Sequence, residues 1–439
     1  MSHSPISVGI YTLGCKVNQY ESEAIAEGFA QRGFSVQSPT LPCDVYVINT
    51  CTVTGESDRK AGQFIRRAIR RNPSAYVLVT GCFSQADPDA VAAIKGVDYV
   101  CGNARKLSVI DEAVRLLQSN QKAEVPGIDR AAPDAYGFED MRIAHFDRTR
   151  AYVKIEDGCE NRCTYCIIPS ARGSVRSKAP SLIVEEVRGL IEGGCREIVL
   201  TGIETASYGK DLDHYRLADL LEEVDRIPNI GRVRLGSLDP SLMTEKFVDR
   251  IARLSCLAPH FHLSMQSASD KILALMKRKY NTRMALEGME RLRAAFPDVQ
   301  FTTDMIVGFP QESDEDFQAS VQFVRDAGFL TVHAFPYSRR KGTVAASMSG
   351  QLPTEIKKQR VAILSQAAKE VREQILAKAQ GQTVEVLFET YQNGMAVGHT
   401  ASFLQVACPS DHPLNAELHP VHITGHTEEL CLGELISSH

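Results

Sequence analysis

Three cysteines in the middle of the chain have a spacing that is typical of an iron-sulfur site. Cys159, Cys163 and Cys166 lie on one short segment, with three and two residues between them. Three thiolates on such a loop can hold three irons of a 4Fe-4S cluster and leave the fourth iron without a protein ligand. A structural zinc ion usually needs four protein ligands, and no fourth Cys or His lies nearby in the sequence. We therefore predict a 4Fe-4S cluster whose open iron suits the amino and carboxylate groups of S-adenosylmethionine (SAM).

A second set of cysteines follows predicted strands in the first hundred residues. Cys15, Cys51 and Cys82 each come at the carboxyl end of a short apolar run. Because parallel strands end at the same edge of a sheet, we expect these thiols to meet where open α/β sheets bind ligands. The alternative is that each is a small buried residue, but three in register favour a second 4Fe-4S cluster. We interpret the remaining cysteines as packing residues: Cys43, Cys101, Cys195, Cys256, Cys408 and Cys431.

The elements that must position the second set alternate short apolar runs with amphipathic helical patterns up to about residue 117. This alternation predicts a doubly wound α/β fold around a parallel sheet. Residues 118–148 are polar, contain Pro and Gly and show no sustained period, so we interpret them as a linker. The predicted strands are Val8–Leu13, Val45–Asn49, Val77–Thr80 and Val97–Val100, and the clearest helices are Glu21–Arg32 and Arg59–Arg71.

The middle of the chain repeats a strand followed by a helix six times. This repetition predicts a partial (β/α)6 barrel, with its chemistry at the carboxyl ends of the strands. A long helix, Glu355–Lys378, follows the last strand. The six predicted strands are Ala151–Ile155, Glu197–Thr201, Val233–Gly236, His260–Met265, Phe301–Val307 and Thr331–Phe335.

The end of the chain changes to short strands separated by turn residues, which predicts a small all-β, OB-like barrel. From Ile375 onward the chain carries one basic residue, Lys378, and seven acidic ones, so its net field repels phosphate. We place three domains, at residues 4–125, 145–375 and 378–439. The predicted strands of the last are Val384–Phe388, Met395–Val406, His419–Thr424 and Glu434–Ile436.

The overall charge is slightly negative, with 49 Lys and Arg against 54 Asp and Glu. A nucleic acid would therefore be held by local basic patches rather than by the global field. No apolar run approaches the ~20 residues of a membrane helix, and the polar start of the chain shows no leader pattern. We expect a cytoplasmic protein without a membrane partner. The candidate patches are Arg59, Lys60, Arg66, Arg67, Arg70 and Arg71, then Lys277, Arg278 and Lys279 beside Tyr280, and Arg339, Arg340 and Lys341.

The cysteine motifs together resemble those of the radical SAM methylthiotransferases, and the resemblance covers nearly the whole chain. Thr12–Glu21, Val47–Thr54 and Thr80–Cys82 resemble the three auxiliary-cluster motifs of that family. The resemblance implies an auxiliary-cluster domain, a radical SAM domain and a terminal TRAM domain, in this order. It also implies that one SAM methylates a sulfur carried on the auxiliary cluster and that a second SAM yields a 5′-deoxyadenosyl radical at the other cluster.

Within the family, two segments resemble the MtaB-type branch, Leu13–Asn18 and Ala171–Ser177. The substrate of that branch is N6-threonylcarbamoyladenosine at position 37 of tRNA, which receives a methylthio group at C2. The MiaB branch, which acts on isopentenyladenosine, usually has Gln-Met-Asn after the first Cys. The alternatives are the MiaB branch, the RimO branch, which modifies an aspartate of a ribosomal protein, and a non-catalytic iron-sulfur RNA-binding protein. Three further segments also resemble the MtaB-type branch: Met276–Tyr280, Thr302–Glu312 and His333–Ser338.

The resemblance also implies sites and partners. Glu204 departs from the family, where His is common, and so does Leu263–Ala268 at the fourth barrel strand. The threonylcarbamoyl carboxylate needs a cation, for which Arg172, Arg176 and Arg278 are the candidates. The expected partners are tRNA and a low-potential electron donor such as flavodoxin or ferredoxin. The expected SAM-binding residues are Tyr165, Gly202, Glu204, Ser264, Gln266 and Asp304.

Overall fold

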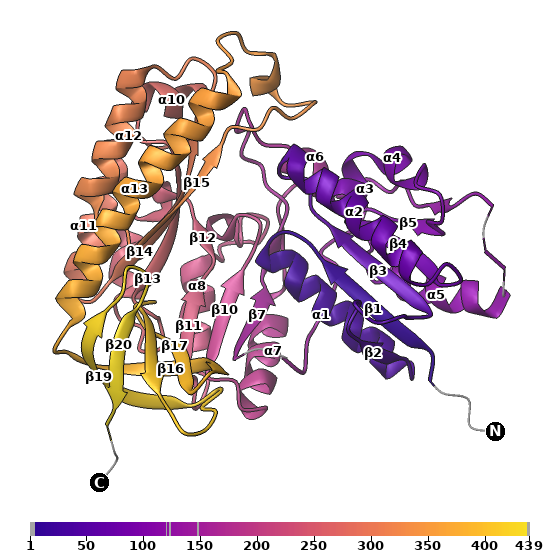
Figure 1. Ribbon diagram of the computed structural model, residues 1–439, viewed down its shortest axis with the longest axis horizontal. Helices are drawn as coiled ribbons and strands as arrows, with labels where there is room; N and C mark the ends of the chain where they lie inside the picture. Colours follow the sequence, from indigo (N-terminus) through magenta and orange to yellow (C-terminus); the bar gives the residue numbers. More distant parts are fainter. Residues whose placement is uncertain (1–4, 120, 123, 147–148, 437–439) are drawn as a thin grey trace.

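The computed structural model describes residues 5–119, 121–122, 124–146 and 149–436. Figure 1 shows three bodies in chain order: an N-terminal unit built on strands β1–β6, a central unit built on β7–β15, and a C-terminal barrel of β16–β20. Residue 4, the predicted start of the first domain, and residues 437–439 lie outside the described residues. None of the helices in the described part of the chain combines the length and apolar composition that a bilayer crossing requires.

The N-terminal unit is a six-stranded parallel sheet in the order β2-β1-β3-β4-β5-β6, as the predicted doubly wound fold requires. The central strands β3 and β4 are buried along their whole length, with separate apolar clusters on the two faces of the sheet. The strands are β1 Ser7–Thr12, β2 Ser35–Gln37, β3 Val45–Thr50, β4 Tyr76–Gly81, β5 Tyr99–Val100 and β6 Gly127–Ile128. The helices are α1 Lys16–Gln31, α2 Gly55–Arg71, α3 Cys82–Ala86, α4 Pro88–Ala92 and α5 Ser108–Ser119.

Two of these helices begin earlier than predicted. Helix α1 starts directly after Cys15, because Val17, Asn18 and Tyr20 are buried against the rest of the protein although their spacing shows no clear apolar face. Helix α2 starts at Gly55, because the Thr54 hydroxyl accepts a hydrogen bond from the Ser57 N–H and caps the first turn. Cys15 and Cys51 therefore both lie close to the start of a helix.

The described part of the predicted linker, residues 118–148, is more ordered than its composition indicated; residues 120, 123, 147 and 148 lie outside the described residues. Strand β6 pairs in parallel with β5 and extends the sheet. Met141 and Ile143 are buried in the core of the central unit, and the Tyr20 hydroxyl donates to the Met141 carbonyl (2.5 Å). A two-residue strand and two isolated apolar residues produce no periodic pattern, which is why the sequence did not reveal them.

The central unit is the predicted partial barrel. Three strands form one parallel sheet in the order β11-β10-β7, and four form another in the order β12-β13-β14-β15. The predicted strand Val233–Gly236 continues across the junction, because the chain runs directly from β11 through Gly236 into β12. The strands are β7 Arg150–Lys154, β8 Glu156–Asp157, β9 Arg176–Ser177, β10 Glu197–Thr201, β11 Arg232–Leu235, β12 Ser237–Leu238, β13 His260–Gln266, β14 Gln300–Val307 and β15 Thr331–Pro336.

Helices follow the strands of the central unit and cover its outer side (Figure 1). The long helix α13 packs against α12 and β15 before the chain enters the last barrel. The helices are α6 Ile168–Arg172, α7 Pro180–Glu192, α8 Leu217–Asp225, α9 Glu245–Ile251, α10 Asp270–Leu275, α11 Thr282–Ala295, α12 Asp314–Ala327 and α13 Thr354–Ala379, with short 3-10 turns at Thr205–Ser207, Pro240–Leu242 and Val344–Ser347.

The C-terminal barrel closes with five strands in the order β16-β17-β18-β20-β19. The prediction of one strand over Met395–Val406 is wrong, because the chain reverses at residues 401–404 and β17 pairs antiparallel with β18. This turn contains no Gly, Pro or Asn, the residues that usually indicate a turn in a sequence. It is held by the Thr400 hydroxyl, which accepts a hydrogen bond from the Leu404 N–H (3.0 Å). The strands are β16 Thr383–Gln392, β17 Met395–Thr400, β18 Gln405–Pro409, β19 Leu418–His426 and β20 Cys431–Leu435.

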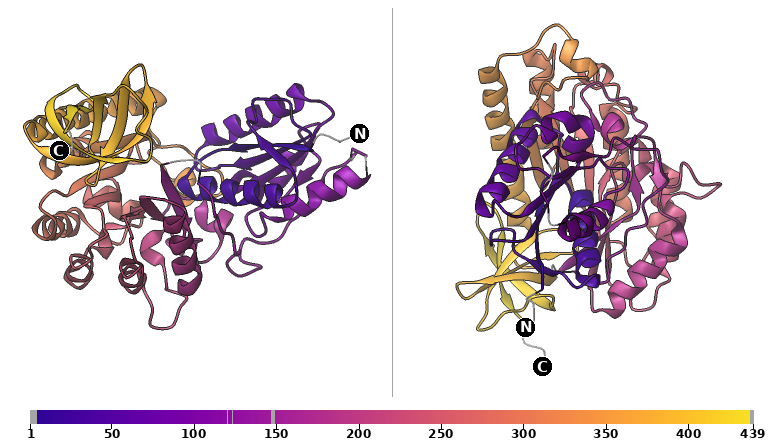
Figure 2. Two further views of the ribbon diagram at one scale, coloured as in Figure 1. Left: turned by 90° about the horizontal axis from the view of Figure 1, so that it is seen from below. Right: turned by 90° about the vertical axis from the view of Figure 1, so that its right-hand side faces the viewer.

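The C-terminal barrel and the N-terminal unit contact the central unit at different places (Figure 2). The turn at residues 401–404 meets the barrel strand β11, where Arg234 donates to the Ala401 carbonyl (3.0 Å). On the other side, Arg340 from the segment after β15 forms an ion pair with Asp58 of α2 (2.5 Å). The carboxyl ends of the central strands thus open toward the N-terminal unit.

Candidate active site

The loop with Cys159, Cys163 and Cys166, here called the central triad, follows β7 and β8 and is held by backbone hydrogen bonds. The Cys159 N–H donates to the Gly173 carbonyl (3.0 Å), and the Cys166 N–H donates to the Cys163 carbonyl (3.1 Å). Thr164 is tied to the end of α10, where its hydroxyl donates to the Leu275 carbonyl (2.8 Å). All three cysteines line one cavity of about 350 Å³.

The cavity gathers residues from both units. Of the six residues predicted to bind SAM, five line it, and Arg278 lines it as well. Val53 and Thr54, which follow Cys51 in the N-terminal unit, also form part of its wall. Gly202 lies behind this wall, where a Cβ would come within 2.6 Å of Glu156 Oε2. The five predicted residues in the lining are Tyr165, Glu204, Ser264, Gln266 and Asp304.

The cavity holds a carboxyl group that is poised to receive a cation. Burial, with the nearby Asp239 carboxylate, raises the pKa of Glu204 to about 7. The only side chain found to donate to Glu204 among the described residues is Asn161, at 3.2 Å. A bound ammonium group would favour the ionised carboxylate, because opposite charges in a buried site attract strongly.

Arg278 donates a hydrogen bond to one cysteine of the central triad. Arg278 donates to Cys163 Sγ (3.2 Å), to Asp239 Oδ2 (2.8 Å) and to the Ser264 carbonyl (3.1 Å). Burial raises the pKa of the thiols of Cys159 and Cys166 to about 12. These thiols therefore need a cationic or metal partner to become thiolates at neutral pH.

Cys15, Cys51 and Cys82, here called the N-terminal triad, come together at the carboxyl edge of β1, β3 and β4. Burial raises the pKa of the Cys51 thiol to about 11, and the nearby Cys82 and Cys15 thiols raise it as well. Gly14 has a φ of +100°, and a Cβ there would lie 2.9 Å from Cys51 Sγ, so the missing side chain lets the first loop approach the second. The predicted meeting of three strand ends is thus observed.

The two triads do not form single-ion sites. Within the described residues, no three His, Cys, Asp or Glu side chains converge closely enough to share one metal ion. Thiolates that hold a 4Fe-4S cluster bind different irons and do not need to converge on one point. Cys101, which we interpreted as a packing residue, is buried among Leu78, Val109 and other apolar side chains.

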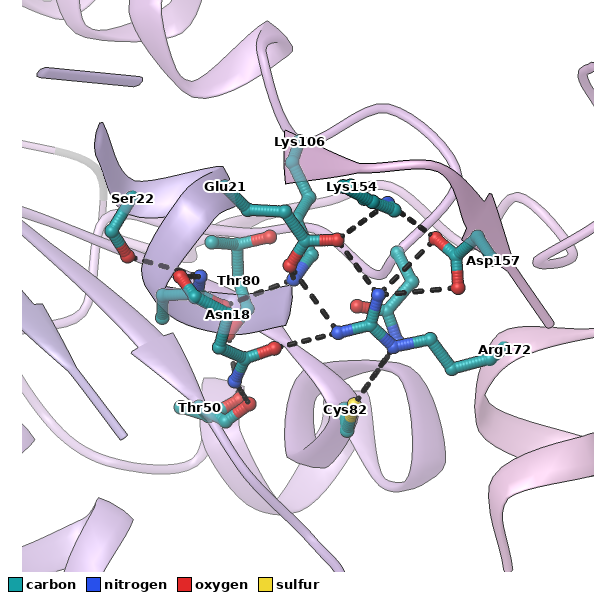
Figure 3. Close-up of polar contacts among 12 residues, drawn as sticks. Asn18, Glu21, Ser22, Thr50, Thr80, Cys82, Lys106, Lys154, Asp157 and Arg172 are labelled. Carbon is teal, nitrogen blue, oxygen red and sulfur yellow. Dashed lines mark hydrogen bonds and ion pairs between the residues drawn. The ribbon is translucent and has the colours of Figure 1, made fainter. Parts of the chain in front are cut away.

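Two of the arginines predicted to meet the substrate lie elsewhere. Arg172 is fully buried, and its guanidinium donates to Glu21, Asp157, Asn18 and Cys82 (Figure 3). It is not available to a substrate, so this part of the prediction is wrong. The sequence placed it near the cysteine loop correctly but could not show that acidic partners from distant segments surround it.

Arg176 is also engaged, since it donates to the carbonyls of Arg172 and Ser174 (both 3.0 Å). Arg278 lines the cavity, but Asp239 already pairs with it. The Tyr280 ring, beside the candidate basic patch, is buried, and its hydroxyl donates to the Met265 carbonyl (2.6 Å). The structure thus uses these three side chains to build the site.

The basic patches differ in what they contact. In α2, Lys60, Arg66, Arg67 and Arg70 are exposed, whereas Arg71 donates to the Tyr11 hydroxyl (2.9 Å). Arg340 belongs to the contact between units, because it also donates to Thr52 (2.7 Å). The exposed part of α2 therefore remains the candidate surface for a phosphate backbone.

The sequence did not single out two side chains at the cavity and one next to Cys15. Val53 and Phe335 line the cavity and are exposed, at 54% and 46%. Lys16, directly after Cys15, is accessible to solvent, but protein atoms surround much of its side chain. The resulting desolvation lowers the pKa of its ammonium group, and the charges of Arg150 and Arg234 lower it further. No hydrogen bond or ion pair of its ammonium group is found among the described residues. Its only sequence signal is a Lys next to a candidate ligand.

Comparison with known proteins identifies both halves of the site. The Radical SAM superfamily matches residues 153–324, and the Uncharacterized protein family UPF0004 matches residues 7–102. The chain is 38% identical over 410 residues to the threonylcarbamoyladenosine tRNA methylthiotransferase MtaB of Bacillus subtilis, covering 91% of this chain and 90% of the relative. It is 35% identical to a tRNA-2-methylthio-N(6)-dimethylallyladenosine synthase of Desulfitobacterium hafniense, covering 89% and 88%.

Among solved structures, the radical SAM methyltransferase TsrM of Kitasatospora setae has a similar fold, with a TM-score of 0.58 at 15% identity, covering 78% of this chain and 77% of that one. The match of the sequence relatives extends over nearly the whole chain, at an identity where fold and reaction type are shared. The chain therefore belongs to the radical SAM methylthiotransferase family of enzymes.

Proposed function

We propose that this protein replaces the hydrogen at C2 of N6-threonylcarbamoyladenosine, at position 37 of tRNA, by a methylthio group. Side-chain bases tuned near neutral pH cannot remove a proton from an aromatic carbon at a useful rate, so a cofactor must provide the reactive species. The observation that carries the proposal is the shared cavity, which is lined both by the central triad and by the residues after Cys51.

The residues of both triads fit 4Fe-4S clusters. The central triad opens onto a cavity of about 350 Å³, and Gly14 leaves room beside Cys51 that a side chain would fill. Each triad also has one guanidinium that donates to a thiol, Arg278 to Cys163 and Arg172 to Cys82. A cationic donor favours the thiolate, which is the form that binds iron. When bound, the two clusters and SAM would supply a radical at the central triad and a sulfur to be transferred at the N-terminal triad.

The side chains around the central triad would bind SAM and the substrate base. Glu204 would receive the ammonium group of SAM, because its carboxyl is buried and has few protein partners. Asp304 is held in place by His262, whose Nε2 lies 3.3 Å from Oδ2. The exposed side chains of Val53 and Phe335 offer an apolar surface to an adenine ring.

The choice of the threonylcarbamoyl branch rests on the names of the relatives and on charge. Five of the relatives, at 35–38% identity, are named threonylcarbamoyladenosine tRNA methylthiotransferase. The threonylcarbamoyl group carries a carboxylate, and Lys16, directly after Cys15, is a cation without a hydrogen-bond or ion-pair partner among the described residues. A buried carboxylate is held strongly when it is paired with a cation.

The proposed partners are tRNA and a low-potential electron donor of the flavodoxin or ferredoxin class. The exposed arginines of α2 would contact the phosphate backbone, with Arg66, Arg67 and Arg70 at its surface. The acidic C-terminal barrel would contact RNA through shape rather than through its net field, since seven acidic residues face one basic residue there.

The test of the reaction is mass spectrometry of tRNA nucleosides from cells with and without the gene. We expect 2-methylthio-N6-threonylcarbamoyladenosine to be lost without the gene and restored by the wild-type chain. Loss of the methylthio derivative of isopentenyladenosine instead would assign the protein to the other tRNA branch. An unchanged nucleoside profile would contradict a tRNA substrate.

The test of the two clusters is the iron content of the anaerobically reconstituted protein. Two sites predict about eight irons per chain. Replacing either triad by alanine should remove about half and leave the other cluster in place. With Cys15, Cys51 and Cys82 replaced, SAM should still be cleaved to 5′-deoxyadenosine, but no methylthio nucleoside should form. Product formation without this triad would contradict its role as sulfur donor.

A further inference from the structure

A buried polar network joins the N-terminal unit to the central unit beside Cys82 (Figure 3). Its centre is Arg172, the last residue of α6. Nε donates to Cys82 Sγ (3.3 Å), and Nη1 donates to Glu21 Oε1 (2.7 Å) and lies 3.2 Å from both oxygens of Asp157. Nη2 donates to Asn18 Oδ1 (2.6 Å) and to Glu21 Oε2 (3.2 Å). The five N–H groups of the guanidinium are therefore all engaged inside the protein.

The network contains more positive than negative charge. Glu21 also accepts from Lys106, and its Oε1 accepts from Lys154 Nζ (2.8 Å). Lys154 in turn pairs with Asp157 Oδ2 (2.6 Å). Arg172 and the two lysines form ion pairs with Glu21 and Asp157, and Arg176 Nη2 also lies 3.8 Å from Asp157 Oδ2, so four cations meet two carboxylates in these pairs. A buried charge is costly unless an opposite charge compensates it, and the cysteine ligands of a cluster at this triad would carry that opposite charge.

The same network reaches the loops of the other two cysteines of the N-terminal triad. Asn18, which Arg172 holds through its side-chain oxygen, donates from Nδ2 to the carbonyls of Leu13 (2.6 Å) and Thr50 (2.9 Å). Leu13 precedes Cys15 by two residues, and Thr50 directly precedes Cys51. Arg172 itself lies six residues after Cys166 of the central triad. One side chain thus links the central cysteine loop to all three cysteine loops of the N-terminal unit.

We propose that Arg172 is a positioning residue for the N-terminal triad, which donates to the sulfur of Cys82 and raises the reduction potential of the cluster bound there. The inference rests on the proposed function, because it requires a cluster at this triad. Hydrogen bonds to the sulfurs and the local net charge are among the factors that set the potential of an iron-sulfur cluster. A buried cation that donates to a ligand sulfur stabilises the more negative, reduced state. Removing it therefore shifts the midpoint potential to a more negative value.

The experiment uses the full-length chain with Cys159→Ala, Cys163→Ala and Cys166→Ala, so that only the N-terminal triad holds a cluster. Iron content is measured first, and the midpoint potential is then measured by a redox titration followed by electron paramagnetic resonance. Arg172→Met removes the charge and every donor, and we expect a more negative midpoint potential and a changed spectrum. Arg172→Lys keeps the charge but not the set of five donors, and we expect a smaller shift in the same direction.

A matched control is Lys178→Met. Lys178 is also fully buried near the contact of the two units, where it pairs with Glu186 (2.6 Å) and donates to the Met141 carbonyl (2.7 Å). None of its hydrogen-bond or ion-pair partners among the described residues is a cysteine, so its loss should lower stability and leave the midpoint potential and the spectrum of the cluster unchanged. A shift in this variant as large as that of Arg172→Met would overturn the specific role of Arg172.

The outcomes separate this inference from the proposed function. A parent chain without iron would overturn the N-terminal cluster and, with it, both proposals. A parent chain that holds iron, with the same potential and spectrum in the Arg172 variants, would overturn the role of Arg172 alone. If Arg172→Met does not fold, Arg172→Lys decides by the same criterion.

Discussion

The guanidinium groups of Arg172 and Arg278 each donate a hydrogen bond to a cysteine sulfur, Cys82 in the N-terminal unit and Cys163 in the central unit. Both arginines were expected to meet the substrate. An arginine near a cysteine loop in the sequence can serve either purpose, since both a thiolate and a carboxylate attract a guanidinium. The acidic residues that pair with each arginine determine whether it is free to bind a substrate carboxylate. Asp239 and Asp157 pair with these arginines from other parts of the chain, and the sequence alone did not reveal that pairing.

At this scale the charge of Glu204 predicts a pH dependence of SAM binding. Burial and Asp239 raise its pKa to about 7 in the free cavity, so the carboxyl is largely protonated below pH 7. It must lose this proton to bind an ammonium group, and the affinity should therefore fall as the pH is lowered below about 7, by up to tenfold per unit. Equilibrium binding of SAM to the reconstituted enzyme between pH 6 and 8 checks this, and Glu204→Gln should flatten the profile.

Lys16 predicts a difference between substrates. Lys16→Gln removes the cation that we propose for the threonylcarbamoyl carboxylate, and a charged hydrogen bond is worth about 1.5–3 kcal/mol. The catalytic efficiency on tRNA with threonylcarbamoyladenosine should therefore fall by roughly 10- to 150-fold, with the iron content intact. The exposed Lys279 is the matched control, and Lys279→Gln should leave the efficiency on this tRNA nearly unchanged. An equal loss in both variants would show that Lys16 acts only through the general attraction of RNA.

At the scale of elements, the glycine at the end of β4 predicts how much stability is lost when a methyl group is added there. Gly81 has a φ of +101°, and a Cβ would lie 2.5 Å from the Thr50 carbonyl oxygen. Gly33 has a φ of +82°, but a Cβ there would meet no atom within 4 Å. Gly33→Ala should therefore cost only the backbone strain, about 1 kcal/mol, whereas Gly81→Ala adds a clash and should cost at least about 2 kcal/mol more. Thermal unfolding of the two variants in the absence of iron compares them.

The elements also show what a sequence can and cannot reveal. The strands before Cys15, Cys51 and Cys82 were predicted because buried parallel strands are continuous apolar runs, and their common edge follows from the topology. The start of α1 at Lys16 and the turn at residues 401–404 were not predicted, since both depend on contacts with distant residues. The same reason applies to Arg172, whose five donors reach four residues on three different segments.

At the scale of the whole molecule, one aromatic side chain lies at the contact between the C-terminal barrel and the central unit. Phe403 stacks between His260 of β13 (4.4 Å) and His399 (4.7 Å), and the guanidinium groups of Arg150 and Arg234 lie over its ring. The acidic barrel thereby meets positive groups of the central unit. This contact helps to hold the acidic barrel against the central unit.

Phe403→Ala should loosen this attachment by about 2 kcal/mol, the sum of several aromatic and cation–π contacts. Hydrogen exchange should then become faster in β18 and in the turn before it, without loss of either cluster. Leu432→Ala is the control, because that side chain is exposed on the same barrel at 36%. Equal protection in the two variants would show that Phe403 does not contribute to this attachment.

The network around Glu21 also has a consequence for how the chain folds during synthesis. Glu21 and Lys106 are both buried in the N-terminal unit, but Lys154 and Arg172, which complete their pairing, leave the ribosome much later. Until these two residues have emerged, Glu21 has Lys106 as its partner in this network, and neither Asn18 nor Cys82 has the guanidinium that donates to it. We therefore expect the three cysteine loops to reach their final arrangement only after the first part of the central unit has been translated.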